Sequence, residues 1–127
     1  MSEARFRVRV AAGSRFDELG SDFVVPHQWT ETGIAVEGGG TGAHLFLTSI
    51  ACCVLNDVYR EAGIRIDGVL VTADGSFDGA TWSTTHVDYD VVVDSPDSDA
   101  VESVLERVDA VAEIPRVVRG TVSVGRR

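Results

Sequence analysis

The sequence predicts an α+β fold organised around one long helix. The first observation is the segment 42–63, GAHLFLTSIACCVLNDVYREAG, in which apolar or small residues occupy every side of a helix between Leu45 and Leu55. The second is a series of short segments in which apolar and polar residues alternate, the pattern of half-buried strands. The third is the length of 127 residues, which suits one domain over 1–127. We expect antiparallel sheets and the element order βββ-α-ββ-α-β.

Alternation of period two predicts a first strand near the N-terminus. Its apolar and basic residues alternate, with Phe6, Val8 and Val10 between Arg5, Arg7 and Arg9. We interpret the arginines as solvated decoration of an edge strand, because surface charges contribute little to stability. Two short strands at 23–25 and 34–36 follow, delimited by Pro26 and Gly33. These three strands form the opening meander.

The segment 37–42, EGGGTG, leads into the long helix. It lacks both GK[ST] and the GxGxxG spacing, so a flexible entry is favoured over a phosphate-binding loop. Thr41 is a suitable N-cap and Gly63 a suitable C-cap. The apolar part of the helix is too short for a bilayer, which needs about 20 residues. A helix that is apolar all round therefore predicts sheet on one side and a second copy of the chain on the other.

The C-terminal half predicts two long strands, a second helix and a last strand. The strands are expected at 64–77 and 81–93, with His86 exposed on the second. Ser95 and Pro96 are expected to cap and to begin the second helix, respectively. That helix should end at Ile114-Pro115, and the last strand should cover 117–124.

The bulk charge and the cysteine count exclude several classes of function. The net charge is −9, with eleven arginines, no lysine and twenty acidic residues, which argues against nucleic acid or an anionic membrane as a partner. The N-terminus carries no apolar signal segment and no segment is expected to span a membrane, so we expect the cytosol. Cys52 and Cys53 are adjacent and cannot reach disulfide geometry on a helix. With the three histidines scattered, we expect neither a metal nor a cofactor.

Four segments, taken in chain order, are informative: the glycine-rich lead with HLFLTSIACCVLNDV, then AGIRIDGVLVTADGSFDG, then VDYDVVVDSPDSDAVESVLERVDAVAEIP, and finally VVRGTVSVG. They cover the chain from about residue 39 onward. In these segments the sequence resembles the OsmC/Ohr family of thiol-dependent hydroperoxide reductases. The resemblance implies an intertwined homodimer with the long helices at its centre. It also implies that a first cysteine attacks the peroxide and a second resolves the resulting sulfenic acid.

In this resemblance Cys53 takes the position of the first cysteine, and Cys52 takes the place of a small residue. The chain departs from the family at three positions. Ile114 stands where the second cysteine would be, and Ala43 stands where the organic-hydroperoxide branch has a glutamate. Arg15 is the candidate for the arginine that keeps the thiolate. The pocket implied beside Cys53 comprises Cys52, Phe46, Ile50, Asp57 and Ile114.

Three functions remain open from the sequence, beside the simple interpretation of Cys53 as a buried core thiol. The first is a one-cysteine hydroperoxide reductase, in which an external thiol reduces the Cys53 sulfenate. The second is a catalytically inactive member of the family that binds an apolar small molecule at the dimer interface, because Ala43 and Ile114 make the pocket more apolar. The third is a hot-dog-type thioesterase with Asp57 as the catalytic carboxylate.

Overall fold

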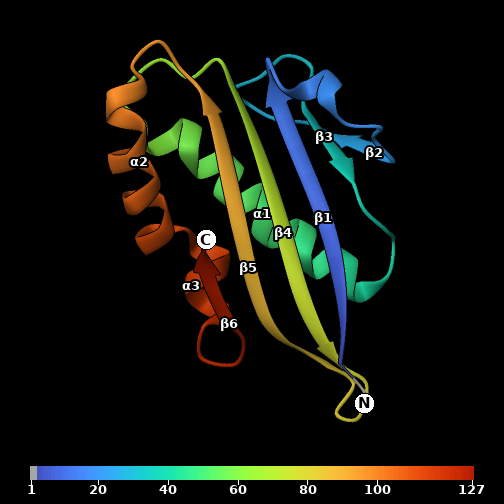
Figure 1. The fold of residues 1–127 in the computed structure, drawn as a ribbon. Helices are drawn as coiled ribbons and strands as arrows, with labels where there is room; N and C mark the ends of the chain where they lie inside the picture. The colour runs from blue at the N-terminus through green and yellow to red at the C-terminus, as the bar shows by residue number, and fades with distance from the viewer. Residues whose placement is uncertain (1–2) are drawn as a thin grey trace.

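The computed structural model describes residues 3–127 and confirms the α+β class and the predicted order of strands and helices (Figure 1). Two elements were not predicted: a short helix, α3, precedes the last strand, and a single 3₁₀ turn, η1, follows the first strand. The elements are β1 (Glu3–Gly13), η1 (Phe16–Glu18), β2 (Phe23–Val25), β3 (Ile34–Glu37), α1 (Gly42–Glu61), β4 (Gly68–Asp78), β5 (Ser83–Asp94), α2 (Ser98–Val111), α3 (Glu113–Val118) and β6 (Ser123–Arg126).

The strands form one six-stranded mixed sheet, and not the purely antiparallel sheets that the sequence predicted. The strand order is β2-β3-β1-β4-β5-β6, and only the β5–β6 pair is parallel among the described strands. The chain leaves β5 and returns through α2 and α3, and such a crossover brings the next strand back in the same direction. The long β1, β4 and β5 make the centre of the sheet.

Helix α1 packs along one face of this sheet (Figure 1). Its buried side chains recur at helical spacing and meet the inward residues of β1 and β4. Val8, Val10 and Val71 are fully buried on the sheet, and Leu47 and Val54 are fully buried on the helix. Helix α2 and helix α3 flank α1 on the β5 and β6 side of the sheet. The core therefore lies between the sheet and α1.

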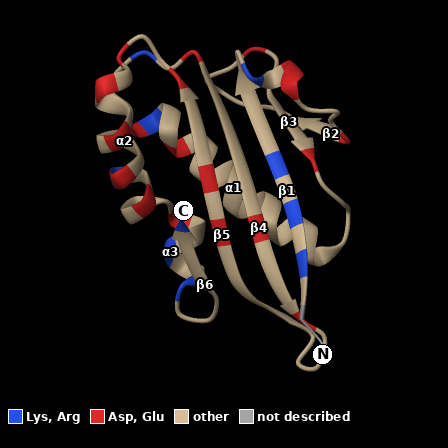
Figure 2. Ribbon diagram, viewed as in Figure 1, with Lys and Arg blue, Asp and Glu red and all other residues tan. Residues whose placement is uncertain are grey.

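Charged residues occur along β1, β4 and β5 (Figure 2), and on β1 they alternate with residues that are buried against α1. Because β1 lies between β3 and β4, it is a central strand, and the expectation of an edge strand was wrong. Its arginines pair with carboxylates on neighbouring strands: Arg7 with Asp74 at 2.7 Å, and Arg9 with Glu37 at 2.7 Å. The basic outer face that the alternation predicted is confirmed, and cross-strand pairs are its partners.

The predicted ends of helix α1 are confirmed, whereas the predicted start of helix α2 is corrected. The Thr41 side chain accepts a hydrogen bond from the His44 N–H, which confirms it as the N-cap of α1, and Gly63 follows the C-cap with a positive φ of 62°. The second helix begins at Ser98 with Asp97 as N-cap. Ser95 instead accepts from the Asp97 N–H and donates to the Arg65 carbonyl, so it closes the preceding turn.

The C-terminal strand is shorter than the sequence predicted. The segment 117–124 begins in helix α3, which ends at Val118, and β6 starts only at Ser123. Pro115 does not end the helical region, because it lies in the first turn of α3, where proline is tolerated. The first residues predicted for β4, 64–67, precede the strand.

Helix α1 has 20 residues and meets, by length and composition alone, the requirement for a membrane span. The expectation that no segment is long enough was therefore wrong. The core helix of a globular protein passes the same test, and α1 packs one side against the sheet. This feature carries no argument for a membrane.

Candidate functional site

Cys52 and Cys53 lie in the middle of α1, on its two flanks. The side of α1 that faces the sheet is buried, whereas Leu45 is 48% exposed and Ser49 is exposed on the outward side. Adjacent helix residues diverge by about 100°, so the two thiols point to different neighbours. Both cysteines are free and partly buried. The pair is therefore two separate thiols, as the sequence predicted.

Cys53 faces the start of α3. The backbone N–H groups of Ile114 and Glu113 hydrogen-bond its sulfur and favour the thiolate, whereas burial and the carboxylates of Asp57 and Glu113 oppose it. Burial is the largest effect, and it raises the pKa of the Cys53 thiol above its ordinary value. At neutral pH the single protomer therefore holds Cys53 mainly as the thiol.

Cys52 lies on the other flank of α1 and is the more strongly perturbed thiol. Burial, with a smaller contribution from neighbouring Cys53, raises the pKa of Cys52 to about 11. A thiol with so high a pKa carries almost no thiolate at neutral pH and is a poor nucleophile.

Three of the predicted pocket residues share one stripe of α1 with Cys53. Phe46, Ile50, Cys53 and Asp57 follow the spacing of residues that lie on the same side of a helix. Ile114 joins Cys53 through its backbone. Ile50 is fully buried and Phe46 is partly buried, so the stripe is largely packed and not an open cleft.

Arg60, and not Arg15, is the arginine coupled to Cys53 in the protomer. It lies two turns after Cys53 on α1, and the charge of Cys53 contributes to the raised pKa of the Arg60 guanidinium, after the larger effects of Asp57 and Glu61. Arg60 Nε is 3.0 Å from Asp57 Oδ1. Arg15 lies after β1, where Asp94 and Glu18 bind its guanidinium. Sequence reasoning missed Arg60, although its spacing from Cys53 along the helix was the available signal.

The loop after β2 covers the Cys52 flank of α1. Its His27 ring lies 5.2 Å from the Tyr59 ring and 5.8 Å from the Trp29 ring, centroid to centroid. Burial lowers the pKa of His27, and the neighbouring Asn56 side chain opposes this effect. The loop and the helix are far apart in sequence, and no local pattern signalled this cluster.

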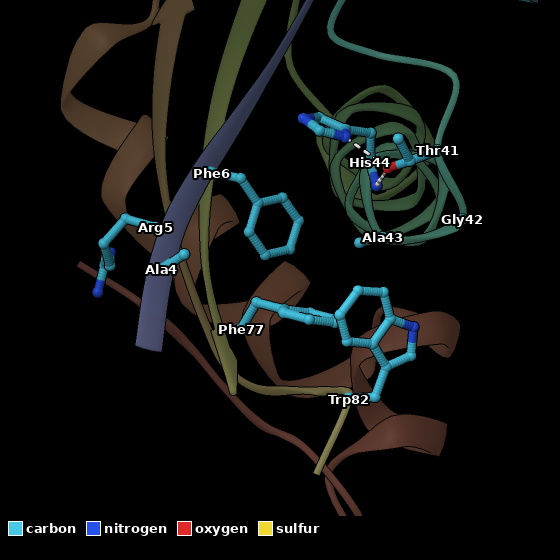
Figure 3. A pocket seen from close by; sticks show the side chains of 9 residues that line it. All are labelled: Ala4, Arg5, Phe6, Thr41, Gly42, Ala43, His44, Phe77 and Trp82. Atoms are coloured by element: carbon cyan, nitrogen blue, oxygen red, sulfur yellow. Dashed lines mark hydrogen bonds between the residues drawn. The ribbon is translucent and has the colours of Figure 1, made fainter. Parts of the chain in front are cut away.

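A cavity of about 450 Å³ lies at the start of α1, beside the ends of β1 and β4 (Figure 3). Sequence reasoning missed it, because it forms where the turn between β4 and β5 meets the helix. Its lining residues are Ala4, Arg5, Phe6, Thr41, Gly42, Ala43, His44, Phe77 and Trp82. A second hollow of about 420 Å³ adjoins it and is lined partly by Phe46.

The described residues, 3–127, contain no group of three histidine, cysteine, aspartate or glutamate side chains that could hold a metal ion. Asp57 is occupied by Arg60, and its side chain is 6% exposed. The arrangement offers two features for chemistry: one partly exposed thiol at Cys53, and one apolar cavity at the start of α1.

The fold and these features define a class of protein: an α+β domain with a six-stranded mixed sheet, a long thiol-bearing helix on one face and an apolar cavity at the helix start. No protein-family model matches the chain, and no curated protein matches it.

Proposed function

We propose that the chain is an OsmC-like, cytosolic homodimer in which Cys53 reduces hydroperoxides and an external thiol regenerates it. The observation that carries the proposal is the contact between Cys53 and the backbone of Ile114, residues far apart in the sequence. The resemblance to the OsmC/Ohr family implies that the first cysteine and the position of the second lie together. Cys53 and Ile114 occupy those two positions.

The proposed reaction uses one thiol of the protein and two of an external reductant. The Cys53 thiolate attacks one oxygen of the hydroperoxide, the O–O bond breaks, and the leaving alkoxide takes a proton to become the alcohol. Cys53 becomes a sulfenic acid, which an external thiol converts to a mixed disulfide with release of water. A second external thiol releases the Cys53 thiol. Ile114 cannot resolve the sulfenic acid, so the external thiol is essential.

The hydrogen bonds to the sulfur support the reactive role, and burial limits it. The N–H groups of Glu113 and Ile114 favour the thiolate, but the pKa of Cys53 remains raised because burial outweighs them. We therefore expect slow peroxide reduction at neutral pH and faster reduction as the pH rises.

The outward side of α1 supports the proposed dimer. Leu45 is 48% exposed there, and Ser49 beside it is exposed, so a second α1 can pack closely on this side. Packing of two such helices would also cover part of the partly exposed Cys53. The test is sedimentation equilibrium of wild type and Leu45→Glu. A monomeric wild type would contradict the dimer.

The test of the chemistry is stopped-flow consumption of cumene hydroperoxide with dithiothreitol as the reductant. Cys53→Ser should abolish consumption, whereas Cys52→Ser should retain it. Dimedone labelling should place the sulfenic acid on Cys53. Equal rates for wild type and Cys53→Ser would refute the reductase.

A second candidate function, binding of an apolar small molecule at the dimer interface without catalysis, is favoured by two observations. The pKa of Cys53 is raised, which disfavours an ionised thiol, and the side chain of Ala43 borders an apolar cavity. Native mass spectrometry of the purified protein should detect a co-purified ligand. Repeatedly ligand-free preparations would count against this function.

The third candidate, a thioesterase that uses Asp57, has less support. The Asp57 carboxylate is buried and held by Arg60 at 3.0 Å, so a base role requires that this pair open. A panel of acyl-CoA substrates tests it, and hydrolysis that is lost in Asp57→Asn would revive it.

A further inference from the structure

The cavity at the start of α1 has aromatic walls on the side away from the helix. Phe6 from β1 and Phe77 from β4 enter it, and Trp82 from the turn between β4 and β5 closes one end (Figure 3). The Ala43 side chain points toward this space from α1. A volume of about 450 Å³ lies in the range of small-molecule sites, roughly 300–1,000 Å³. The walls and the size suit one planar apolar ring.

Trp82 is held in a backbone conformation that tryptophan rarely adopts. Its φ is 55°, in the left-handed region, and it is the only residue other than glycine with a positive φ among those described. The side chain is nonetheless 80% exposed, although its ring packs edge-on against Phe77 at 5.1 Å between centroids. Residues held in such sparsely populated backbone conformations cluster at active sites and ligand-binding sites.

The strand that follows Trp82 is also irregular at the cavity. The pairing of β4 with β5 shifts register between Ser76 and Phe77. Such bulges re-aim side chains and are common beside binding sites. The extra residue is Thr85 on β5, opposite the step from Ser76 to Phe77, and the Phe77 ring forms one wall of the cavity. The bulge and the strained Trp82 therefore lie at the same end of the β4–β5 hairpin, beside the cavity.

The polar end of the cavity is the first turn of α1. This turn contains no acidic side chain, and Thr41 Oγ1 already accepts from the His44 N–H at 3.2 Å. The N–H groups of Gly42 and Ala43 have no acceptor within the helix, because the first turn of any helix lacks one. Arg5 does not compete for a ligand, since its guanidinium turns away and donates to Ser76 at 3.0 Å. A carboxylate or carbonyl oxygen is therefore the group that this end would accept.

We propose that this cavity binds a small aromatic carboxylate. The ring lies between Trp82 and Ala43, against Phe6, and the carboxylate accepts hydrogen bonds from the first turn of α1. The proposal rests on the ligand-binding role of the second function proposed above, but it places the ligand in a cavity of one protomer and not at the dimer interface. The site is separate from Cys53, which is 11 residues further along the helix, or roughly 16 Å at the helical rise.

The experiment uses the emission of Trp82 in the full-length protein. The chain has two tryptophans, so Trp29→Phe leaves Trp82 as the sole reporter. Titration with 3-phenylpropionate should change this emission to saturation. The matched amine, 3-phenylpropylamine, should bind about tenfold more weakly, because it brings no acceptor to the helix start.

Three variants locate the site by calorimetric titration with 3-phenylpropionate. Ala43→Leu should fill the cavity and abolish binding, whereas Ala110→Leu, at an exposed position on α2, should not change it. Trp82→Gly should abolish binding while the urea midpoint stays equal or rises, because glycine adopts the left-handed backbone without strain. Cys53→Ser should leave binding intact.

Several outcomes would overturn the proposal. One is the absence of a saturable response, and another is binding that Ala43→Leu does not alter. A third is a Trp82 emission that changes on dilution without any probe, since a second copy of the chain would then cover the cavity. A co-purified ligand that persists in Ala43→Leu would refute this site while leaving the more general ligand-binding function intact.

Discussion

Removal of one hydroxyl group from Tyr89 is expected to destabilise the fold, whereas the same change in Tyr59 is not. Tyr89 on β5 is fully buried, and its hydroxyl donates to the Asp109 carboxylate on α2. Arg119 donates to the same carboxylate at 3.3 Å and to the Asp109 carbonyl at 3.0 Å. The Tyr59 hydroxyl is also buried, but it has no hydrogen-bond partner among the residues that the structure describes.

The magnitude follows from the partners that remain. A hydrogen bond to a charged group contributes about 1.5–3 kcal/mol. The Asp109 side chain is 36% exposed and keeps its ion pair with Arg119, so water and Arg119 partly replace the hydrogen bond that Tyr89 donated. Tyr89→Phe should therefore lower the free energy of unfolding by roughly 1.5 kcal/mol. In a chain of this length the melting temperature should fall by about 5 °C. Tyr59→Phe removes a buried hydroxyl with no partner, so its effect should lie between zero and a stabilisation of about 1 kcal/mol.

The assay is urea unfolding followed by circular dichroism, at one protein concentration for all variants because association affects the midpoint. Phenylalanine keeps the ring in both substitutions, so the difference between them isolates the hydroxyl groups. The double variant Tyr89→Phe/Asp109→Asn should cost less than the sum of the single changes. Equal stabilities for Tyr89→Phe and Tyr59→Phe would show that the buried network does not stabilise the fold.

Three further outcomes are expected. Burial lowers the pKa of His27 in the folded protein, so the contribution of neutral His27 to stability is complete above the unfolded pKa of about 6.5 and is lost as the pH falls below it. The urea midpoint of wild type should therefore drop more between pH 7.5 and pH 5.5 than the midpoint of His27→Gln. Equal drops in the two midpoints would contradict this. Gly75→Ala would place a methyl group 2.6 Å from Phe6 Cζ, so it should cost about 1 kcal/mol and Phe6→Leu should restore most of the loss. Iodoacetamide should alkylate Cys53 before Cys52, whose pKa is about 11, and mass mapping that finds Cys52 modified first would reverse their assignment.

The reactivity of Cys53 depends on the groups that surround it within the protomer. Within one protomer, burial holds the thiol protonated although two backbone N–H groups favour the thiolate. Arg60 is the positive group near it, but Asp57 and Glu61 bind Arg60 at 3.0 and 3.2 Å. Breaking the pair with Asp57 would free positive charge for the thiolate. The rate of Cys53 alkylation in Asp57→Asn, compared with wild type, measures this coupling.

Much of the central helix could be predicted from the sequence by itself. Thr41 caps α1, Gly63 follows its end, and the apolar spacing between them fixes the helix, because capping and periodicity are interactions between near neighbours in the chain. The alternation of Phe6 with Arg7 likewise determined which side of β1 is charged.

Only the tertiary structure decided the features that join distant segments. The parallel pairing of β6 with β5, the helix at 113–118, the packing of His27 on Tyr59 and the partners of Arg15 all depend on contacts between residues far apart in sequence. The cavity belongs to the same group, because it exists only where the turn that carries Trp82 meets the start of α1. Local sequence fixes hydrogen bonds within a few residues, whereas register, crossover direction and cavity shape are set by how the whole chain packs.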